Sequence, residues 1–284
     1  MKHAVMKSAA ALCALATLGA PALAQTDETN ANRSWTGAYI GGSGGYTWND
    51  RNGDETVQFD TNRDGKFGDQ VNTAAGANAF QPGFCDGAAA SNSAAGGCRN
   101  DKDGTAWNVH AGFDKQFGGV VAGLVVEGGK AYVSDSASAF SSTPASYAMT
   151  RQLGWNGTAR ARLGVAIGGS TLVYATGGGT YGKFKNSFAT TNMFNTFTQT
   201  KTKENLWGWV AGGGIEQKVS DNFSIGVLYK YTRFQSSDYR VNAGQGTPPS
   251  LTNPFVITAA GSTDFARDSR FVTHGAQVTA SFRF

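Results

Sequence analysis

Eight segments of the chain alternate apolar and polar residues with a period of two, which is the spacing of side chains on the two faces of a β-strand. In one of them Trp155, Ala159 and Leu163 fall on one face, whereas Arg160 and Arg162 fall on the other. The eight segments cover residues 35–48, 105–116, 120–133, 152–167, 171–184, 205–219, 223–239 and 269–284. The pattern therefore predicts strands that each have one apolar and one polar side.

The connections between these segments alternate in length. Residues 118–119, 168–170 and 220–222 are short and rich in Gly, Ser, Asp and Asn, as in tight hairpin turns. Long polar stretches at 49–104, 134–151, 185–204 and 240–268 separate the hairpins. Short turns at one end and long loops at the other are typical of outer-membrane barrels. We therefore predict an all-β fold: an eight-stranded antiparallel transmembrane β-barrel with short periplasmic turns and long extracellular loops, over residues 35–284.

A soluble β-sandwich is the alternative fold, because its strands alternate in the same way. The polar face of these strands, however, collects the ionisable residues His110, Asp114, Glu127, Arg160, Arg162, Glu216 and Lys230. In a barrel of eight strands such side chains would fill a narrow lumen while the apolar face meets lipid. Trp107, Trp155, Trp207 and Trp209 begin strands at the expected outer ends, where an interfacial aromatic belt belongs. These features favour the barrel.

The first 24 residues have the pattern of a cleaved secretory signal. Lys2 and Lys7 precede a short apolar run, and Ala22-Leu23-Ala24 fits a signal-peptidase site. Residues 25–34 would then form a short periplasmic segment. Losing Lys2 and Lys7 lowers the formal charge from +4 to +2, which is too close to neutral to indicate a nucleic-acid partner. No later segment has the roughly 20 apolar residues of a membrane helix.

Composition agrees with the barrel. The chain contains 39 Gly, 12 % aromatic residues and 15 % charged residues, against about 25 % charged residues in ordinary soluble domains. The stretches "WTGAYIGGSGGYTW", "LVYATGGGTYGKFK", "GGGIEQKVSDNFSIGVLYKYT" and "VTASFRF" resemble the small outer-membrane β-barrel family of porin-like, opacity-type proteins in Gram-negative bacteria. The resemblance spans nearly all of residues 35–284 and implies an eight-stranded barrel in the cell outer membrane.

The same resemblance implies that the aromatic end of the last strand, Phe282 and Phe284, is read by the barrel assembly machinery. A protein in this membrane has outer-membrane lipid and lipopolysaccharide as its surroundings. The sequence identifies no extracellular partner.

The first long loop contains the start of a calcium-loop pattern. Asp60, Asn62 and Asp64 alternate before Gly65, as do the oxygen ligands at positions 1, 3 and 5 of an EF-hand loop. The bidentate Glu of position 12 is replaced by Val71, although Asp69 could substitute for it from position 10. Calcium is thus the one candidate cofactor, and an ordinary solvated turn is the alternative.

Two cysteines remain after removal of the signal, which contains Cys13. Cys85 and Cys98 flank a stretch of small residues, and an oxidising compartment favours a disulfide between them. On the chain-entropy model such a bridge contributes about 3 kcal/mol.

The sequence contains no catalytic motif, and the residues suggest no nucleophile–base–orienter arrangement. The triple glycines at 177–179 and 212–214 lack P-loop residues and are better explained as room for large lumen neighbours. We therefore predict an integral outer-membrane protein with a structural or surface-interaction role and a lumen plugged by polar side chains. A small porin-like channel for ions or solutes is the alternative, and an outer-membrane enzyme is a third hypothesis.

Overall fold

The computed structural model describes residues 34–50, 55–267 and 270–284. The predicted signal peptide lies outside the described residues, as does the following segment up to residue 33. None of the described residues forms a helix long and apolar enough to span a bilayer. The eight long strands are β1 (Gly37–Asn49), β6 (Gly104–Phe117), β7 (Val120–Ser141), β8 (Ala145–Ile167), β9 (Thr171–Thr190), β11 (Lys203–Lys218), β12 (Phe223–Phe234) and β15 (Val272–Arg283).

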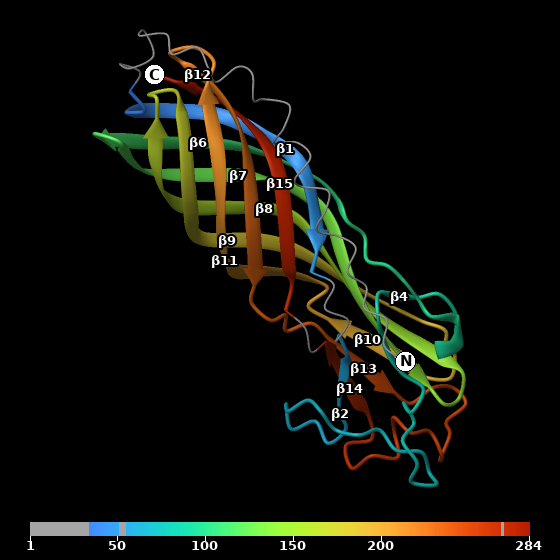
Figure 1. Ribbon diagram of the computed structural model, residues 1–284. Coiled ribbons are helices and arrows are strands. Elements are labelled where there is room, and N and C mark those ends of the chain that lie inside the picture. Colours follow the sequence, from blue (N-terminus) through green and yellow to red (C-terminus); the bar gives the residue numbers. More distant parts are fainter. Residues whose placement is uncertain (1–33, 51–54, 268–269) are drawn as a thin grey trace.

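These eight strands close into a barrel (Figure 1). Their order in the sheet is β7-β6-β1-β15-β12-β11-β9-β8, and β7 pairs again with β8 to complete the ring. Every pairing in the ring is antiparallel, including that of the first strand with the last, where Ile40 lies opposite Phe282. The predicted eight-stranded antiparallel barrel is confirmed. The β6–β7 turn uses Gly118 with φ of 60°, a left-handed conformation that glycine adopts without a Cβ clash.

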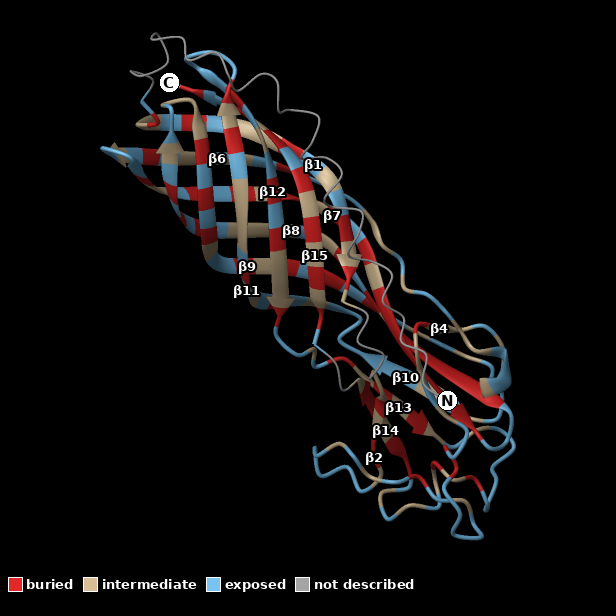
Figure 2. Ribbon diagram, in the orientation of Figure 1, coloured by how far each residue is buried: buried red, intermediate tan, exposed pale blue. Residues whose placement is uncertain are grey.

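Burial alternates along the barrel strands, as Figure 2 shows. On β8 the outward Leu163 is 61 % exposed, whereas its neighbour Arg162 is 5 % exposed and points into the barrel. The four predicted belt tryptophans are all outward and at least 41 % exposed. Phe282 and Phe284 are also outward, with ring centroids 5.3 Å apart. Their role as an assembly signal stays a prediction.

The long connections form a folded extracellular module instead of irregular loops. Strands β10 (Thr196–Thr200), β13 (Arg240–Gly244), β14 (Thr263–Arg267) and β2 (Val57–Asp60) make a second antiparallel sheet beyond the loop end of the barrel (Figure 1). The expectation of a long loop over residues 134–151 is wrong, because β7 and β8 continue through it and turn only at residues 142–144. β9 also continues past the predicted residue 184, to Thr190.

The module has its own hydrophobic core, between the second sheet and the outer ends of β7 and β8. Its fully buried members include Phe59, Tyr147, Phe255 and Phe265, whose rings pack at centroid distances such as 5.0 Å for Phe59 and Phe265. The hairpin residues 134–151 are mostly Ser and Ala. Their sequence looks polar, but their small side chains fit between layers. This property explains why the pattern predicted a loop.

The other face of the β7–β8 hairpin is covered by residues 83–99 of the first long connection, which contain β3 (Gly83–Asp86), β4 (Ala88–Ala89), a 3₁₀ turn (Ala94–Gly96) and β5 (Cys98–Arg99). β3 pairs with β7, and Ser138 on β7 donates to the carbonyl of Gly87 at 2.8 Å. The predicted disulfide between Cys85 and Cys98 is present, with Cα atoms 6.1 Å apart. The disulfide cross-links this covering segment beside β7.

Candidate functional site

The lumen charges gather into two buried ion clusters, and Arg162 on β8 is the centre of the first. Its Nε donates to Asp114 Oδ1 at 2.8 Å, its Nη2 also contacts Asp114, and its Nη1 donates to Glu216 Oε1 at 2.7 Å. Asp114 Oδ2 accepts a further hydrogen bond from Arg283 Nη2 at 2.8 Å. Strands β6, β8, β11 and β15 are thereby tied together across the lumen.

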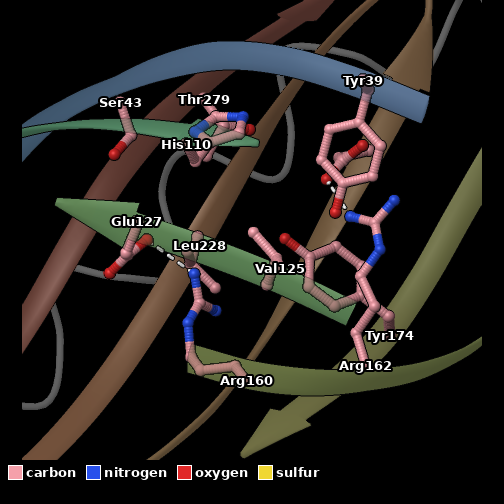
Figure 3. A pocket seen from close by; sticks show the side chains of 11 residues that line it. Tyr39, Ser43, His110, Val125, Glu127, Arg160, Arg162, Tyr174, Leu228 and Thr279 are labelled. Atoms are coloured by element: carbon pink, nitrogen blue, oxygen red, sulfur yellow. Dashed lines mark hydrogen bonds and ion pairs between the residues drawn. The ribbon is translucent and has the colours of Figure 1, made fainter. Parts of the chain in front are cut away.

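Glu127 on β7 is the centre of the second cluster. Its Oε2 accepts from Arg160 Nη2 at 2.6 Å, and its Oε1 accepts from Lys230 Nζ at 2.5 Å. Figure 3 shows the Glu127–Arg160 contact beside the Arg162 side chain. All three groups are buried. Each buried charge therefore has a partner of opposite sign, which is the condition for keeping it in a low-dielectric interior.

Of the seven predicted lumen residues, only His110 stands outside both clusters. Its Nε2 lies 2.9 Å from Ser281 Oγ, and its ring meets Tyr39 edge-on at a centroid distance of 6.1 Å. A serine beside a histidine is the first half of a nucleophile–base pair. The cavity that His110 lines holds only about 20 Å³, which admits roughly one water molecule and no substrate.

The lumen is closed above and below these ion clusters. Toward the module, Val133, Leu153, Phe184, Phe234 and Phe271 belong to one buried apolar cluster, in which Phe184 lies 5.0 Å from both other rings. A cavity of about 40 Å³ lies between this lid and the charges.

At the turn end, Trp35 fills the lumen with Val121, Leu172 and Leu228, and is fully buried. Its carbonyl accepts from Arg283 Nη1 at 2.6 Å. Apolar layers therefore seal both ends.

Sequence reasoning missed three large contributors to the lumen. Arg283 completes the Asp114 cluster, and the rings of Tyr39 and Tyr174 lie 4.8 and 5.0 Å from the Arg162 guanidinium. The signal was available, since all three have the inward parity of their strands. The glycine-rich stretches do provide room: a Cβ on Gly214 would come 2.7 Å from Tyr174 Oη.

A third ion cluster lies outside the barrel and joins the module to it. Arg267 on β14 donates from Nη2 to Asp135 Oδ1 on β7 at 2.8 Å and also contacts Glu55. Arg151 Nη2 donates to the other oxygen of Asp135 at 2.9 Å. Glu55, Asp86 and Asp135 place carboxylate oxygens within 4.8 Å of one another. Because two buried guanidiniums supply the positive charge there, we interpret the group as an ion-pair cluster and not as a metal site.

We predict that the module is less stable at pH 8.5 than at pH 5.5. Burial raises the pKa of Glu55 to about 7 despite Arg267, and burial beside Asp135 raises the pKa of Asp101 to about 8. Both unfolded values are about 4. Between pH 4 and 8 the folded module therefore holds protons that the unfolded chain releases, so stability falls as the pH rises.

Limited proteolysis of the detergent-folded protein at the two pH values measures this dependence. Cleavage within the module should be faster at pH 8.5, and Glu55→Gln should reduce the difference. Slower cleavage at pH 8.5, after correction for the pH profile of the protease, would contradict the prediction.

The residues of the calcium pattern hydrogen-bond the loop backbone. Asp60 Oδ2 accepts from Gly65 N at 2.8 Å, Asn62 Oδ1 accepts from Asp64 N at 2.9 Å, and Asp69 Oδ2 accepts from Thr61 N at 2.9 Å.

Calcium binding by this loop stays a prediction. Calorimetric titration should give a calcium heat that the double variant Asp60→Ala, Asp64→Ala lacks; identical titrations of both proteins would identify an ordinary turn.

The module also contains an uncharged groove of about 550 Å³. Its walls are the β7–β8 turn, the β9–β10 connection and residues 247–255, and its lining includes the rings of Tyr147 and Phe255. The lining otherwise consists of small apolar residues, prolines, hydroxyl and amide side chains and Phe194, with no charged side chain.

Several polar groups in this groove are pre-positioned. Asn192 Nδ2 donates to Tyr147 Oη at 2.8 Å and to Asn195 Oδ1 at 3.1 Å. Asn253 is 9 % exposed and its Oδ1 accepts from Phe255 N, whereas its Nδ2 makes no hydrogen bond to another described residue. The groove thus offers a fixed amide donor beside aromatic surface.

The closed antiparallel ring, the lipid-type outer face and the polar lumen together define an integral outer-membrane β-barrel protein. Comparison with known proteins agrees. The sequence model of the family described as "Outer membrane protein beta-barrel domain" matches residues 10–284, so the chain belongs to this family. It is a protein of the cell outer membrane.

The relatives carry the same kind of name. The 31 kDa outer-membrane immunogenic protein of Brucella melitensis is 30 % identical over 241 residues, which cover 82 % of this chain and 87 % of that protein. The 22 kDa outer membrane protein of Rhizobium leguminosarum is 32 % identical over 136 residues, covering 48 % and 56 % of the two chains. The crystal structure of OprG from Pseudomonas aeruginosa aligns with a TM-score of 0.47 and 11 % identity, covering 88 % of this chain and 97 % of that one.

Proposed function

We propose that this protein is a surface-interaction barrel, in which the membrane part anchors and the extracellular module binds a ligand outside the cell. The observation that carries this proposal is the module itself. Long connections with no binding role need no shared core, yet here they bury Phe59, Tyr147 and Phe265 together and cover both faces of one hairpin. Binding residues are commonly placed on segments that a rigid scaffold positions in this way.

The groove indicates the class of ligand. Its volume of about 550 Å³ is within the range of small-molecule sites, and its lining has no charge with which to hold an ion. A sugar ring has an apolar C–H face that packs on aromatic rings, and hydroxyls that accept from and donate to amides. Phe194, which is 80 % exposed, and the Nδ2 group of Asn253 match those two requirements. The proposed ligand is therefore an uncharged glycan.

The channel hypothesis is less well supported. A conducting path would have to cross the Phe184–Phe234–Phe271 lid, two ion clusters and Trp35, and the cavities between them hold about 20 and 40 Å³. Eight strands leave an interior that side chains fill. The relatives' names also give no support to an enzyme.

Two measurements test the proposal. The purified barrel should bind neutral glycans on an array, and Asn253→Ala and Phe194→Ala should each weaken binding, while Met193→Ala, at a neighbouring exposed residue outside the groove lining, should not. In planar bilayers the same preparation should show no steady single-channel openings. Sustained openings would favour the channel, and absence of any glycan binding would leave only a structural role.

A further inference from the structure

Four lysines gather on the outer wall of the barrel, near its loop end. Lys130 on β7, Lys183 and Lys185 on β9 and Lys203 on β11 line a hollow of about 500 Å³. The same hollow is lined by Trp155 of the aromatic belt and by Tyr132. On β9 and β11 the lysines lie toward the module from Tyr181 and Trp207, which is the order expected at a membrane boundary. On β7 Lys130 precedes Tyr132, and its Nζ lies 4.7 Å from the centroid of the Tyr132 ring.

Strand parity places these lysines on the lipid-facing side. Lys183 and Lys185 are exposed and flank the buried Phe184, so they point away from the lumen. Lys130 lies ten residues along β7 from Val120. At about 3.3 Å per residue and a tilt of about 40°, that distance is about 25 Å across the membrane, the height of the apolar band of such barrels. Lys130 therefore lies at the outer edge of the lipid band, and Lys183, Lys185 and Lys203 lie beyond that edge, toward the module.

Their charges are not neutralised by the protein. Lys185 and Lys203 lie directly opposite each other on paired strands, an arrangement in which like charges destabilise the sheet. Among the described residues none of the four lysines forms an ion pair. The one carboxylate in the lining, Glu204, accepts instead from Asn186 Nδ2 at 2.6 Å and from Ser237. An anion from outside the chain would remove this repulsion.

We propose that Lys130, Lys183, Lys185 and Lys203 bind the phosphate groups of a phosphorylated glycolipid in the outer leaflet, lipopolysaccharide. Lysine is a compact phosphate-binding cation, and basic clusters at the membrane boundary attract anionic headgroups. The hollow opens on the lipid-facing wall, where Trp155, directly opposite Lys130 on the paired strand β8, can contact the headgroup–acyl boundary. A lipid phosphate is held at this depth by its own acyl chains, which a free phosphate ion is not.

The test uses the full-length barrel in detergent, titrated with bisphosphorylated lipid A and followed by native mass spectrometry. The triple variant Lys183→Gln, Lys185→Gln, Lys203→Gln should bind roughly 100-fold more weakly, because each lysine near an anionic headgroup contributes about fivefold. Lys115→Gln is the matched control, since Lys115 is an exposed lysine on the outward face of β6 near the turn end. It should bind as the wild type does.

Fully dephosphorylated lipid A should bind the wild type as weakly as the bisphosphorylated form binds the triple variant. Equal binding of both lipids, an equal loss in Lys115→Gln, or displacement of lipid A by equimolar inorganic phosphate would each overturn the proposal. The single variant Lys203→Gln gives an independent check with two readouts of opposite sign. In lipid-free detergent Lys203→Gln should raise the midpoint of urea unfolding, because it removes the repulsion with Lys185. The same variant should bind lipid A about fivefold more weakly. A lowered unfolding midpoint together with unchanged lipid A binding would also overturn the proposal.

Discussion

Replacing Arg162 with Ala is expected to destabilise the folded barrel by roughly 3–5 kcal/mol, the cost of removing one partner from a buried ion pair. The change leaves Glu216 without its guanidinium and leaves Asp114 with Arg283 alone. It also removes the group between the rings of Tyr39 and Tyr174. Urea unfolding in detergent, followed by the heat-modifiable electrophoretic band of the folded barrel, measures the loss.

Arg160→Ala is the matched comparison, because it is also a buried arginine on β8. The loss of folding stability in Arg160→Ala should be smaller than in Arg162→Ala, because Glu127 keeps its contact with Lys230 at 2.5 Å. Adding Glu127→Ala to Arg160→Ala should recover part of the loss, and the double-mutant cycle gives the coupling between the two side chains. Equal losses in the two arginine variants, or strictly additive losses in the cycle, would contradict the plugged-lumen description. Waters in the lumen would reduce the size of these effects without changing their order.

Arg267→Ala is expected to release the extracellular module from the barrel while the barrel itself stays folded. Arg267 is the cation on β14 that bonds both the side chain and the carbonyl of Asp135 on β7, the latter at 2.7 Å, and it also contacts Glu55. Without it Glu55 loses its guanidinium partner and the buried Asp135 keeps only Arg151, and the loss of folding stability of the module should again be roughly 3–5 kcal/mol. Limited proteolysis should then cut the module and leave a heat-modifiable barrel fragment.

Lys201→Ala is the control for this variant. It removes the exposed Lys201–Asp238 ion pair of the same module, whose side chains are 57 % and 70 % exposed. Such surface pairs contribute about 0–1 kcal/mol, so its proteolysis should match the wild type. If Arg267→Ala were cut no faster than Lys201→Ala, the cluster would not hold the module in place.

The sequence predicted the features of this protein that depend on residues close together in the chain. The parity of β8, with Arg160 and Arg162 on one side and Leu163 on the other, is a local property and identified the strand, its faces and the barrel. Short turns such as that at Gly118 predicted three of the strand pairings, because a tight hairpin can join only adjacent antiparallel strands. Cys85 and Cys98 could be paired because no other cysteine follows the signal segment.

The sequence did not predict which charged side chains pair with each other. Parity showed that Asp114 points inward, but its contacts with Arg162 and Arg283 join β6 to β8 and β15 across the lumen. The sequence did not predict the folded extracellular module for a related reason. Residues 134–151 read as polar because they are mostly Ser and Ala, and only packing of Phe59 and Phe265 from distant connections makes that hairpin a buried layer. The same holds for the lysines, since the register of β9 with β11 sets Lys185 opposite Lys203.

By itself, then, the sequence determined the eight strands of the ring and their two faces, because these follow from the alternation of side chains along a strand. It also determined three hairpin pairings, which follow from short connections, and the disulfide, because only two cysteines follow the signal segment. Only the tertiary structure decided which charges meet in the lumen, that apolar layers close both of its ends, and that the long connections share a core. Those features depend on contacts between residues far apart in the chain, and a one-dimensional pattern records the type of each residue but not the neighbour that it meets.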